Sequence, residues 1–399
     1  MRISTLEIQR QAVAAINDRQ VELATTQSRL ASGRRVLTPA DDPAAAERIL
    51  TLKEQLNGNA QFARNANRAT NRLQLEETVL ANVTDILQGI RDRAVQGANA
   101  SLSAADRRFV AADVEQSLDA LLALSNTRDA NGEYIFAGNR TLTEPFARGP
   151  GNAVTYNGDQ DQRELLIGPG RRMPVGDDGV EVFQRIPNGN GTFRITDAPG
   201  NTGSGVAGGG SVVDPGAFDA ADYTIDFTAS DVFQVVNDAT EVVVAGGTFQ
   251  PGDTIAFQGI QVRIQGRPAA GDAFAVTAST SQDLFTTVQN TIDALRGNVA
   301  TANPDGGFNN AIGRSLADLD QALENILDIR AQVGARLATI EDEDNIRQDV
   351  NLFTETTLSE LEDLDFAKAA SDFNLQLTAL QAAQQAFTRI QGLSLFNFL

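Results

Sequence analysis

Residues 69–94 read ATNRLQLEETVLANVTDILQGIRDRA, and their apolar side chains recur in alternating steps of three and four. The same spacing runs from Leu316 to Ile340, near the other end of the chain. This repeat is typical of helices that pack along one face, as in a coiled coil. We therefore predict two long helices whose inner seams form an ordinary bundle core. The seam residues are Ala69, Leu73, Glu76, Leu80, Val83, Leu87, Ile90 and Ala94, with Leu316, Leu319, Leu323, Ile326, Arg330, Val333, Leu337 and Ile340.

Two further apolar seams lie outside this pair, one at each end of the chain, and repeat every seven residues. They can pair with each other and, in a stack of copies, with neighbouring subunits. Burying one such side chain contributes about 1.5–3 kcal/mol, whereas ordering each backbone residue costs about 1–2 kcal/mol. A single helix pair is therefore marginal, and we predict termini that are disordered in the monomer and helical in an assembly. The predicted subunit-interface residues are Ile16, Leu23, Leu30, Leu37, Phe366, Phe373, Leu377, Leu380, Phe387 and Ile390.

The middle of the chain differs from both flanks in composition. The whole chain has 34 Gly and 12 Pro residues, and most of them lie between Gly138 and Gly271. Gly and Pro favour turns and break helices. The fold class is therefore predicted as α+β: a long, coiled-coil-like helical bundle formed by the N- and C-terminal regions, with an inserted β-rich central domain. The Gly-rich stretch 200–216 is predicted as a loop that separates two lobes of this domain. The expected strands are 134–137, 164–167, 180–185, 192–196, 223–228, 241–244, 254–258, 261–265 and 273–278.

Helix starts can be located from capping residues. Thr38-Pro39 and Asp42-Pro43 each place a capping residue before a proline, and we favour Asp42 as the start of the long helix. Ser103 and Asp106 have the spacing of a capping box, which predicts a helix from there to about Thr127. Asn131-Gly132 then predicts a tight turn before the strand 134–137.

These patterns predict four parts of the chain. Residues 1–42 form an N-terminal axial helical segment, and residues 351–399 form a C-terminal axial helix. Residues 43–137 and 277–350 form the bundle between them. The inserted β-rich domain takes residues 138–276, with its second lobe at about 197–276.

Composition excludes several classes of function. The formal net charge is −20, which disfavours nucleic acid and anionic membrane surfaces as partners. The chain has no Cys and no His, which excludes thiolate or imidazole catalysis and the usual zinc sites. We predict no enzyme activity, no cofactor and no metal; the acidic cluster from Asp214 to Asp226 lacks the spacing of a calcium loop. No apolar run reaches the length of a membrane span, and the polar start of the chain predicts no cleavable signal.

Several motifs, in order, resemble those of the flagellin superfamily. They are RLASGRRVLTPADDPAA at 29–45, YIFAG at 134–138, EPF at 144–146, GRPAAGDAF at 266–274, VGARLATIE at 333–341, LDFA at 364–367 and LQAAQQAF at 380–387. Pro39 and Pro43 and the YIFAG motif favour the hook–filament junction branch of this superfamily over flagellins proper. The resemblance covers roughly 1–185 and 250–399, and residues 187–250 share none of it.

The resemblance implies a structural subunit of the bacterial flagellum that joins the hook to the flagellin filament. Its implied partners are copies of itself in a ring, a hook-side hook-associated protein, flagellin, and an export chaperone that binds the C-terminal helix. Its implied location is outside the cell, at the hook–filament junction, after type III export without a cleaved signal. The alternatives are a flagellin of the filament itself, or a secreted adhesin or hydrolase carried by the central β domain.

Charge is distributed unevenly between the two ends. Residues 1–75 hold 11 Lys and Arg against 7 Asp and Glu, whereas residues 341–399 hold 3 against 11. Opposite charges favour association of the two arms and set their register. The alternative is that each set of charges lies on a solvated helix face, where exposed ion pairs contribute little.

Overall fold

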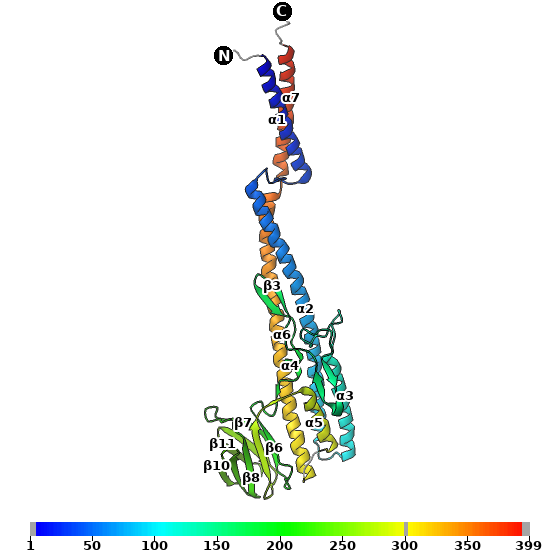
Figure 1. Cartoon of the computed structure of the whole chain (residues 1–399), viewed down its shortest axis with the longest axis vertical. Helices are drawn as coiled ribbons and strands as arrows, with labels where there is room; N and C mark the ends of the chain where they lie inside the picture. The colour runs from blue at the N-terminus through cyan, green and yellow to red at the C-terminus, as the bar shows by residue number, and fades with distance from the viewer. Residues whose placement is uncertain (1–4, 299–301, 393–399) are drawn as a thin grey trace, which may run out of the picture. The chain divides into compact units, whose positions relative to one another are not determined.

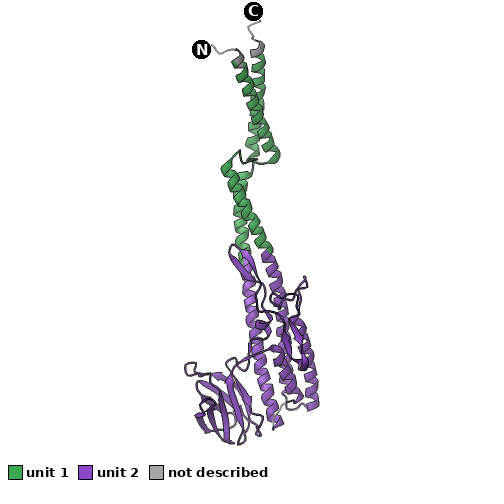
Figure 2. Ribbon diagram, viewed as in Figure 1, with its two compact units in different colours: residues 1–64, 342–399 green, residues 65–341 purple. Residues whose placement is uncertain are grey.

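A computed structural model describes residues 5–298 and 302–392. The chain forms two compact units (Figure 2). The first, the terminal unit, comprises residues 1–64 and 342–399, and the second comprises residues 65–341. Two long helices, α2 (Pro43–Gly97) and α6 (Pro304–Glu362), contribute residues to both units.

The terminal unit is helical. Helix α1 (Thr5–Ser32) packs along α7 (Phe366–Gly392), and the first part of α2 accompanies the last part of α6 (Figure 1). Helix α2 begins where the sequence predicts, because the Asp42 carboxylate accepts a hydrogen bond from the Ala45 N–H at 3.0 Å. This bond satisfies a donor that has no partner within the helix.

The second unit contains a helical core. Helices α3 (Ala104–Ser125) and α5 (Leu284–Arg296) lie against the remaining parts of α2 and α6 (Figure 1). All eight predicted seam residues of α2 are buried, which confirms that seam. On α6, Leu319, Ile326, Val333 and Ile340 are buried, and the other apolar seam residues are half-buried against the same core. The predicted capping box at the start of α3 is present, with Ser103 and Asp106 bonded reciprocally.

Short elements follow α3 and cover the side of this core. They pair antiparallel as β1–β2, β3–β4 and β5–β14. Their bounds are β1 (Phe146–Arg148), the 3-10 helix η1 (Pro150–Asn152), β2 (Val154–Tyr156), β3 (Glu164–Gly168), β4 (Arg171–Pro174), α4 (Gly179–Phe183), β5 (Ile186–Pro187) and β14 (Ser281–Gln282).

The remaining eight strands form a β lobe with its own hydrophobic cluster, which includes Tyr223, Phe227 and Phe274. One antiparallel sheet has the order β10-β9-β8-β13-β6, and a second has the order β11-β12-β7. Asn310 of α6 bonds to this lobe through Gly205 O and Ala207 N. The strands are β6 (Phe193–Asp197), β7 (Val206–Val212), β8 (Tyr223–Ala229), β9 (Val232–Asn237), β10 (Val242–Thr248), β11 (Thr254–Phe257), β12 (Ile260–Gln265) and β13 (Ala273–Ala278).

Three sequence predictions for the middle of the chain are wrong. Residues 134–137 form no strand beyond an isolated bridge of Tyr134 to Arg128; they lie in a turn-rich segment in which all four side chains are buried. Residues 180–185 contain helix α4, because the Asp178 carboxylate caps it through the Val180 and Glu181 N–H groups. The predicted loop 200–216 contains strand β7, which pairs with β12.

Glycine is required in β7 by a close approach. A Cβ atom at Gly210 would lie 2.6 Å from the Phe193 ring and 2.7 Å from the Gln261 carbonyl oxygen. The glycines of this stretch therefore allow the strand to pack closely against its neighbours, which composition alone does not distinguish from a flexible loop.

Candidate functional site

The two terminal seams meet in the pair formed by α1 and α7. Leu380 is buried, whereas Ile16, Leu23, Leu30, Phe373 and Phe387 are only half-buried. A pair of helices can shield one face of each helix, so the seams are covered in part. The side chain of Ile390 lies outside the described residues.

Three predicted interface residues remain exposed. Phe366 begins α7, and Leu377 lies further along it, with exposed fractions of 57% and 37%. Leu37 lies beyond the end of α1, in the segment that leads to α2, and is also 37% exposed. The seven-residue repeat predicted it on the helix, but α1 ends at Ser32 and Gly33 takes the left-handed φ of +70°.

The outer side of the helix pair also carries large apolar residues that the sequence repeat does not single out. Val21 and Leu375 are 66% and 70% exposed, and Val13 is 44% exposed. Val13 and Val21 lie on α1 and Leu375 lies on α7, so both helices carry exposed large apolar side chains. The pair is therefore suited to packing against further helices.

A polar joint links the two chain segments where α1 and α6 end. The Arg35 N–H donates to the Glu362 carbonyl oxygen at 2.8 Å. The Glu362 carboxylate, only 8% exposed as a residue, lies 2.9 Å from Arg34 and 2.7 Å from Lys53. The sequence pattern does not reveal this joint, because its two sides are more than 300 positions apart. Arg34 and Arg35 lie within the motif at 29–45, and Glu362 lies two residues before the motif at 364–367.

Two carboxylates shape the turn that leads into α2. Backbone and side-chain hydrogen bonds from Thr38 hold the pKa of Asp41 below its usual range. The Ala45 N–H, with a smaller contribution from Arg35, lowers the pKa of Asp42. Both residues are thus explained by capping and turn formation.

Glu76 is a charged-type residue inside the apolar seam of α2. Burial, and secondarily the neighbouring Asp177 carboxylate, raise the pKa of Glu76 to about 8. Its Oε1 accepts a hydrogen bond from the Asp177 N–H at 3.0 Å, and Arg336 of α6 holds the Asp177 carboxylate through bonds of 2.9 and 3.0 Å. This buried network joins α2, the segment before α4, and α6.

The described residues contain no group of three or more His, Cys, Asp or Glu placed to hold a metal ion. Over the same part of the chain, none of the helices is both long and apolar enough to span a bilayer. The features that stand out are therefore helical packing surfaces and the polar joints that position them.

Comparisons with known proteins match the helical regions at both ends of the chain. Residues 3–141 match the bacterial flagellin N-terminal helical region, and residues 316–399 match the flagellin C-terminal helical region. The crystal structure of FlgL from Xanthomonas campestris is 33% identical in sequence and has a TM-score of 0.70, covering 77% of this chain and 99% of that chain. This chain belongs to the flagellar hook-associated protein 3 family.

Further relatives support this membership. Flagellar hook-associated protein 3 of Escherichia coli (strain K12) is 28% identical over 398 residues, which are 100% of this chain and 99% of that protein. Hook-associated protein 3 of Legionella pneumophila is 32% identical with a TM-score of 0.73, over 78% of this chain and 98% of that chain. The chain is a structural protein of the flagellar junction type.

Two other matches refine this assignment. Flagellins match over shorter stretches, with one aligned over 71% of this chain but only 56% of its own length. Residues 196–278 match the D2-like domain of flagellar hook-associated protein 1, so the β lobe, in which sequence analysis found no resemblance from 187 to 250, has a relative within flagellar proteins.

Proposed function

We propose that copies of this chain form a ring that joins a hook-side hook-associated protein to the flagellin filament. The observation that carries the proposal is the partial burial of the seams: Leu380 is covered in the single chain, whereas Phe366, Leu375 and Val21 are not. In a ring, neighbouring copies and the adjoining flagellar proteins would remove these side chains from water. Each large apolar side chain covered in this way contributes about 1.5–3 kcal/mol.

Export also belongs to the proposal. The terminal helices α1 and α7 become ordered only on assembly, and an export chaperone binds the C-terminal helix through the same apolar residues that later meet other subunits. The chain reaches the outside of the cell through the flagellar type III apparatus without a cleaved signal. The half-buried seams support this view, because helices that bury few apolar side chains are marginal alone.

The β lobe is a dispensable outer module in this proposal. Its ends lie together, because the Ser279 N–H donates to the Thr192 carbonyl oxygen at 2.9 Å. A short Gly-Ser linker can therefore replace residues 193–278 without pulling the helical core apart. Such a variant should still assemble, whereas an adhesin or hydrolase carried by the lobe would lose its activity on removal.

A gene deletion tests the junction role directly. We expect cells that lack this chain to keep intact hooks, to lose their filaments and to release flagellin monomers into the medium. The full-length chain supplied in trans should restore filaments. Absent filaments without released flagellin would instead favour the filament subunit itself, and normal filaments would refute both functions.

A further inference from the structure

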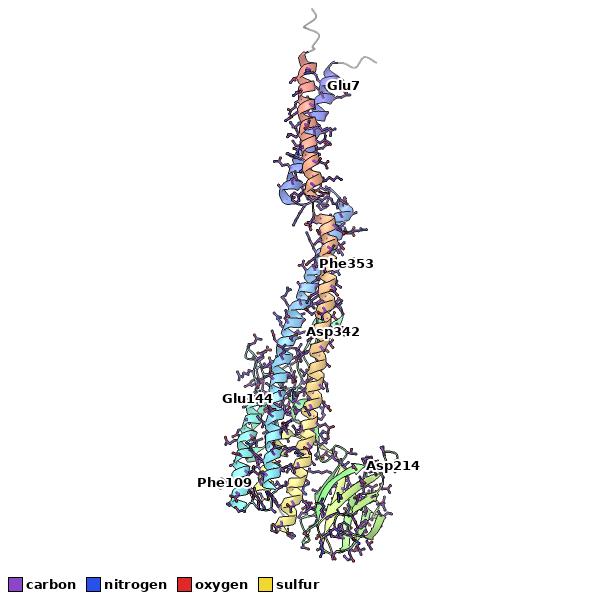
Figure 3. All side chains as sticks on the ribbon, turned by 180° about the vertical axis from the view of Figure 1, so that it is seen from behind. Glu7, Phe109, Glu144, Asp214, Asp342 and Phe353 are labelled. Atoms are coloured by element: carbon purple, nitrogen blue, oxygen red, sulfur yellow. The ribbon has the colours of Figure 1, made fainter. Side chains whose placement is uncertain are left out.

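An apolar stripe on α6 is left exposed by the described residues of the chain. Ile346, Val350 and Phe353 are 56%, 37% and 75% exposed, and their spacing of four and three residues places them on one face of the helix. Figure 3 labels Phe353 on this helix. All three residues belong to the terminal unit.

A groove continues this stripe towards the end of α6. It has a volume of about 610 Å³ and is lined from both helices, by Arg48, Thr51 and Leu52 of α2 and by Thr357 and Leu361 of α6, among others. Thr357 follows Phe353 by four residues, so the groove and the stripe share a face of α6. The helix pair formed here by α2 and α6 is open on its α2 side at Gly58, where an added Cβ atom would meet no atom within 4 Å.

Acidic residues flank the stripe on α6, and an exposed basic residue lies on α2. Asp342 and Asp349 are exposed, as is Arg64 on α2. None of the three has an ion pair or a hydrogen bond among the described residues. Leu50, 60% exposed on α2, precedes Arg64 by two heptads and so shares its line on the helix surface. We call Leu50 and Arg64 the α2 ridge.

The ridge points away from the groove, whose lining includes Arg48, Thr51 and Leu52 but not Leu50. The pair formed by α2 and α6 therefore presents an apolar stripe flanked by acidic residues on α6, and a ridge with an apolar and a basic residue on α2. Two different, complementary surfaces on one molecule give a contact that repeats from copy to copy and closes into a ring or continues as a helix.

The spacings of the two surfaces agree. Leu50 and Arg64 are 14 residues apart on α2, which is about 21 Å along the helix axis. Phe353 and Asp342 are 11 residues apart on α6, which is about 17 Å along that axis. Neighbouring copies in a ring have the same orientation, so the α2 ridge of one meets α6 of the next in antiparallel direction. Setting Leu50 against Phe353 then brings Arg64 to within about 4 Å of Asp342 along the axis, which the long arginine side chain spans.

We propose that the α6 stripe of each copy receives the α2 ridge of a second copy of this chain. Leu50 packs against Val350 and Phe353, and Arg64 pairs with Asp342. The inference rests on the proposed function, because it names which faces meet when copies assemble side by side. It gives the helical coil, and not only the terminal helices, a share in holding the ring together.

Cross-linking tests this contact, since the natural chain has no Cys. Cells without their own copy express two full-length variants together, Leu50→Cys and Phe353→Cys, and assembled flagella are treated with a short bis-maleimide. The matched control replaces Phe353→Cys by Leu352→Cys, because Leu352 is 66% exposed but points about 100° away around α6. We expect roughly tenfold more dimer cross-linked between positions 50 and 353 than between 50 and 352, because thiol cross-linking requires proximity and direction.

Charge reversal provides a second test. Arg64→Glu alone and Asp342→Arg alone each place like charges at the contact, so each should reduce incorporation. The two variants expressed together should restore it, because opposite charges are recovered wherever the two variants alternate. No rescue by the mixture, together with equal cross-linking at 352 and 353, would overturn the proposal.

The outcomes separate this inference from the proposed function. If the natural chain fails to restore filaments, the junction role fails. If filaments form and Phe353→Cys cross-links to flagellin or to a hook-side protein instead of a second copy, the stripe serves another partner and only this inference is wrong.

Discussion

The backbone N–H of Leu364 donates to the carbonyl oxygen of Gly33 at 3.0 Å, which ties the end of α6 to the end of α1. Both long chain segments break at this joint, and the left-handed φ of Gly33 (+70°) allows one of the two breaks. The Phe366 ring lies beside Gly33, within 3.5 Å of where a Cβ atom would stand. The joint thus fixes where α1 ends and where α7 begins.

Replacing Glu362→Gln should loosen this joint. The substitution removes the carboxylate that pairs with Arg34 and Lys53. Both cations are more than a third exposed and can be solvated, so we expect the free energy of unfolding to fall by only about 1 kcal/mol. Hydrogen exchange of residues 33–42 should quicken in the assembled protein. Glu360→Gln is the control, because no ion pair of Glu360 is found among the described residues; equal exchange in the two variants would contradict the role of Glu362.

The raised pKa of Glu76 should make the free energy of unfolding fall as pH rises. Its folded pKa of about 8 lies above the ordinary value of 4.5, so the folded state binds a proton more tightly than the unfolded state. Its contribution is therefore fully present below pH 4.5 and is lost as pH rises towards 8, by up to about 1.4 kcal/mol per unit. Urea unfolding between pH 5 and 8 measures this slope.

The variant Glu76→Gln should flatten that slope, because the amide keeps the acceptor for the Asp177 N–H and does not titrate. Glu341→Gln, at an exposed position of the same unit, should leave the slope unchanged. Equal slopes for the natural chain and Glu76→Gln would mean that Glu76 is not the titrating group.

Leu375 should matter for assembly and not for the isolated chain. It is 70% exposed on α7, so Leu375→Gln should leave the circular dichroism of the purified protein unchanged. In a ring it would lose a buried leucine contact of about 1.5–3 kcal/mol, and incorporation should fall at least roughly tenfold. Gln384→Ala, an exposed polar site on the same helix, should incorporate normally; a similar loss there would argue against a specific apolar contact.

Glycine 210 should be required for the fold of the β lobe. Gly210→Ala places a methyl group against the Phe193 ring and should destabilise the lobe by about 1–3 kcal/mol. At Gly209 no atom lies within 4 Å of an added Cβ, so Gly209→Ala is the matched control. Thermal unfolding followed by limited proteolysis distinguishes the two, and equal melting would contradict the close approach.

The sequence predicts the helical part of this fold well, because a long repeat averages over many residues. All eight seam positions from Ala69 to Ala94 are buried, and Asp42 caps α2 as expected. The middle is harder: residues 180–185 have β-forming side chains, yet one carboxylate, Asp178, provides a cap that starts a helix. In β7, the three consecutive glycines 208–210 have low β propensity, so the strand depends on its neighbours.

The candidate surfaces were predicted only in part. A seven-residue repeat identifies the terminal seams, but it cannot tell which members a partner helix covers: Leu380 is buried and Phe366 is not. It also misplaced Leu37, since a single glycine ends α1 before that residue. The stripe at Phe353 and the Glu362 joint depend on how distant segments come together, which spacing along the chain does not reveal.

Hydrogen exchange of the terminal helices tests the central claim most directly. Residues 5–32 and 366–392 would be compared in the purified single chain and in assembled flagella. We predict rapid exchange in the single chain and strong protection after assembly, because neighbouring subunits complete the burial of the seams. Equal, strong protection in the isolated chain would show that α1 and α7 satisfy each other, and would contradict assembly through their exposed faces.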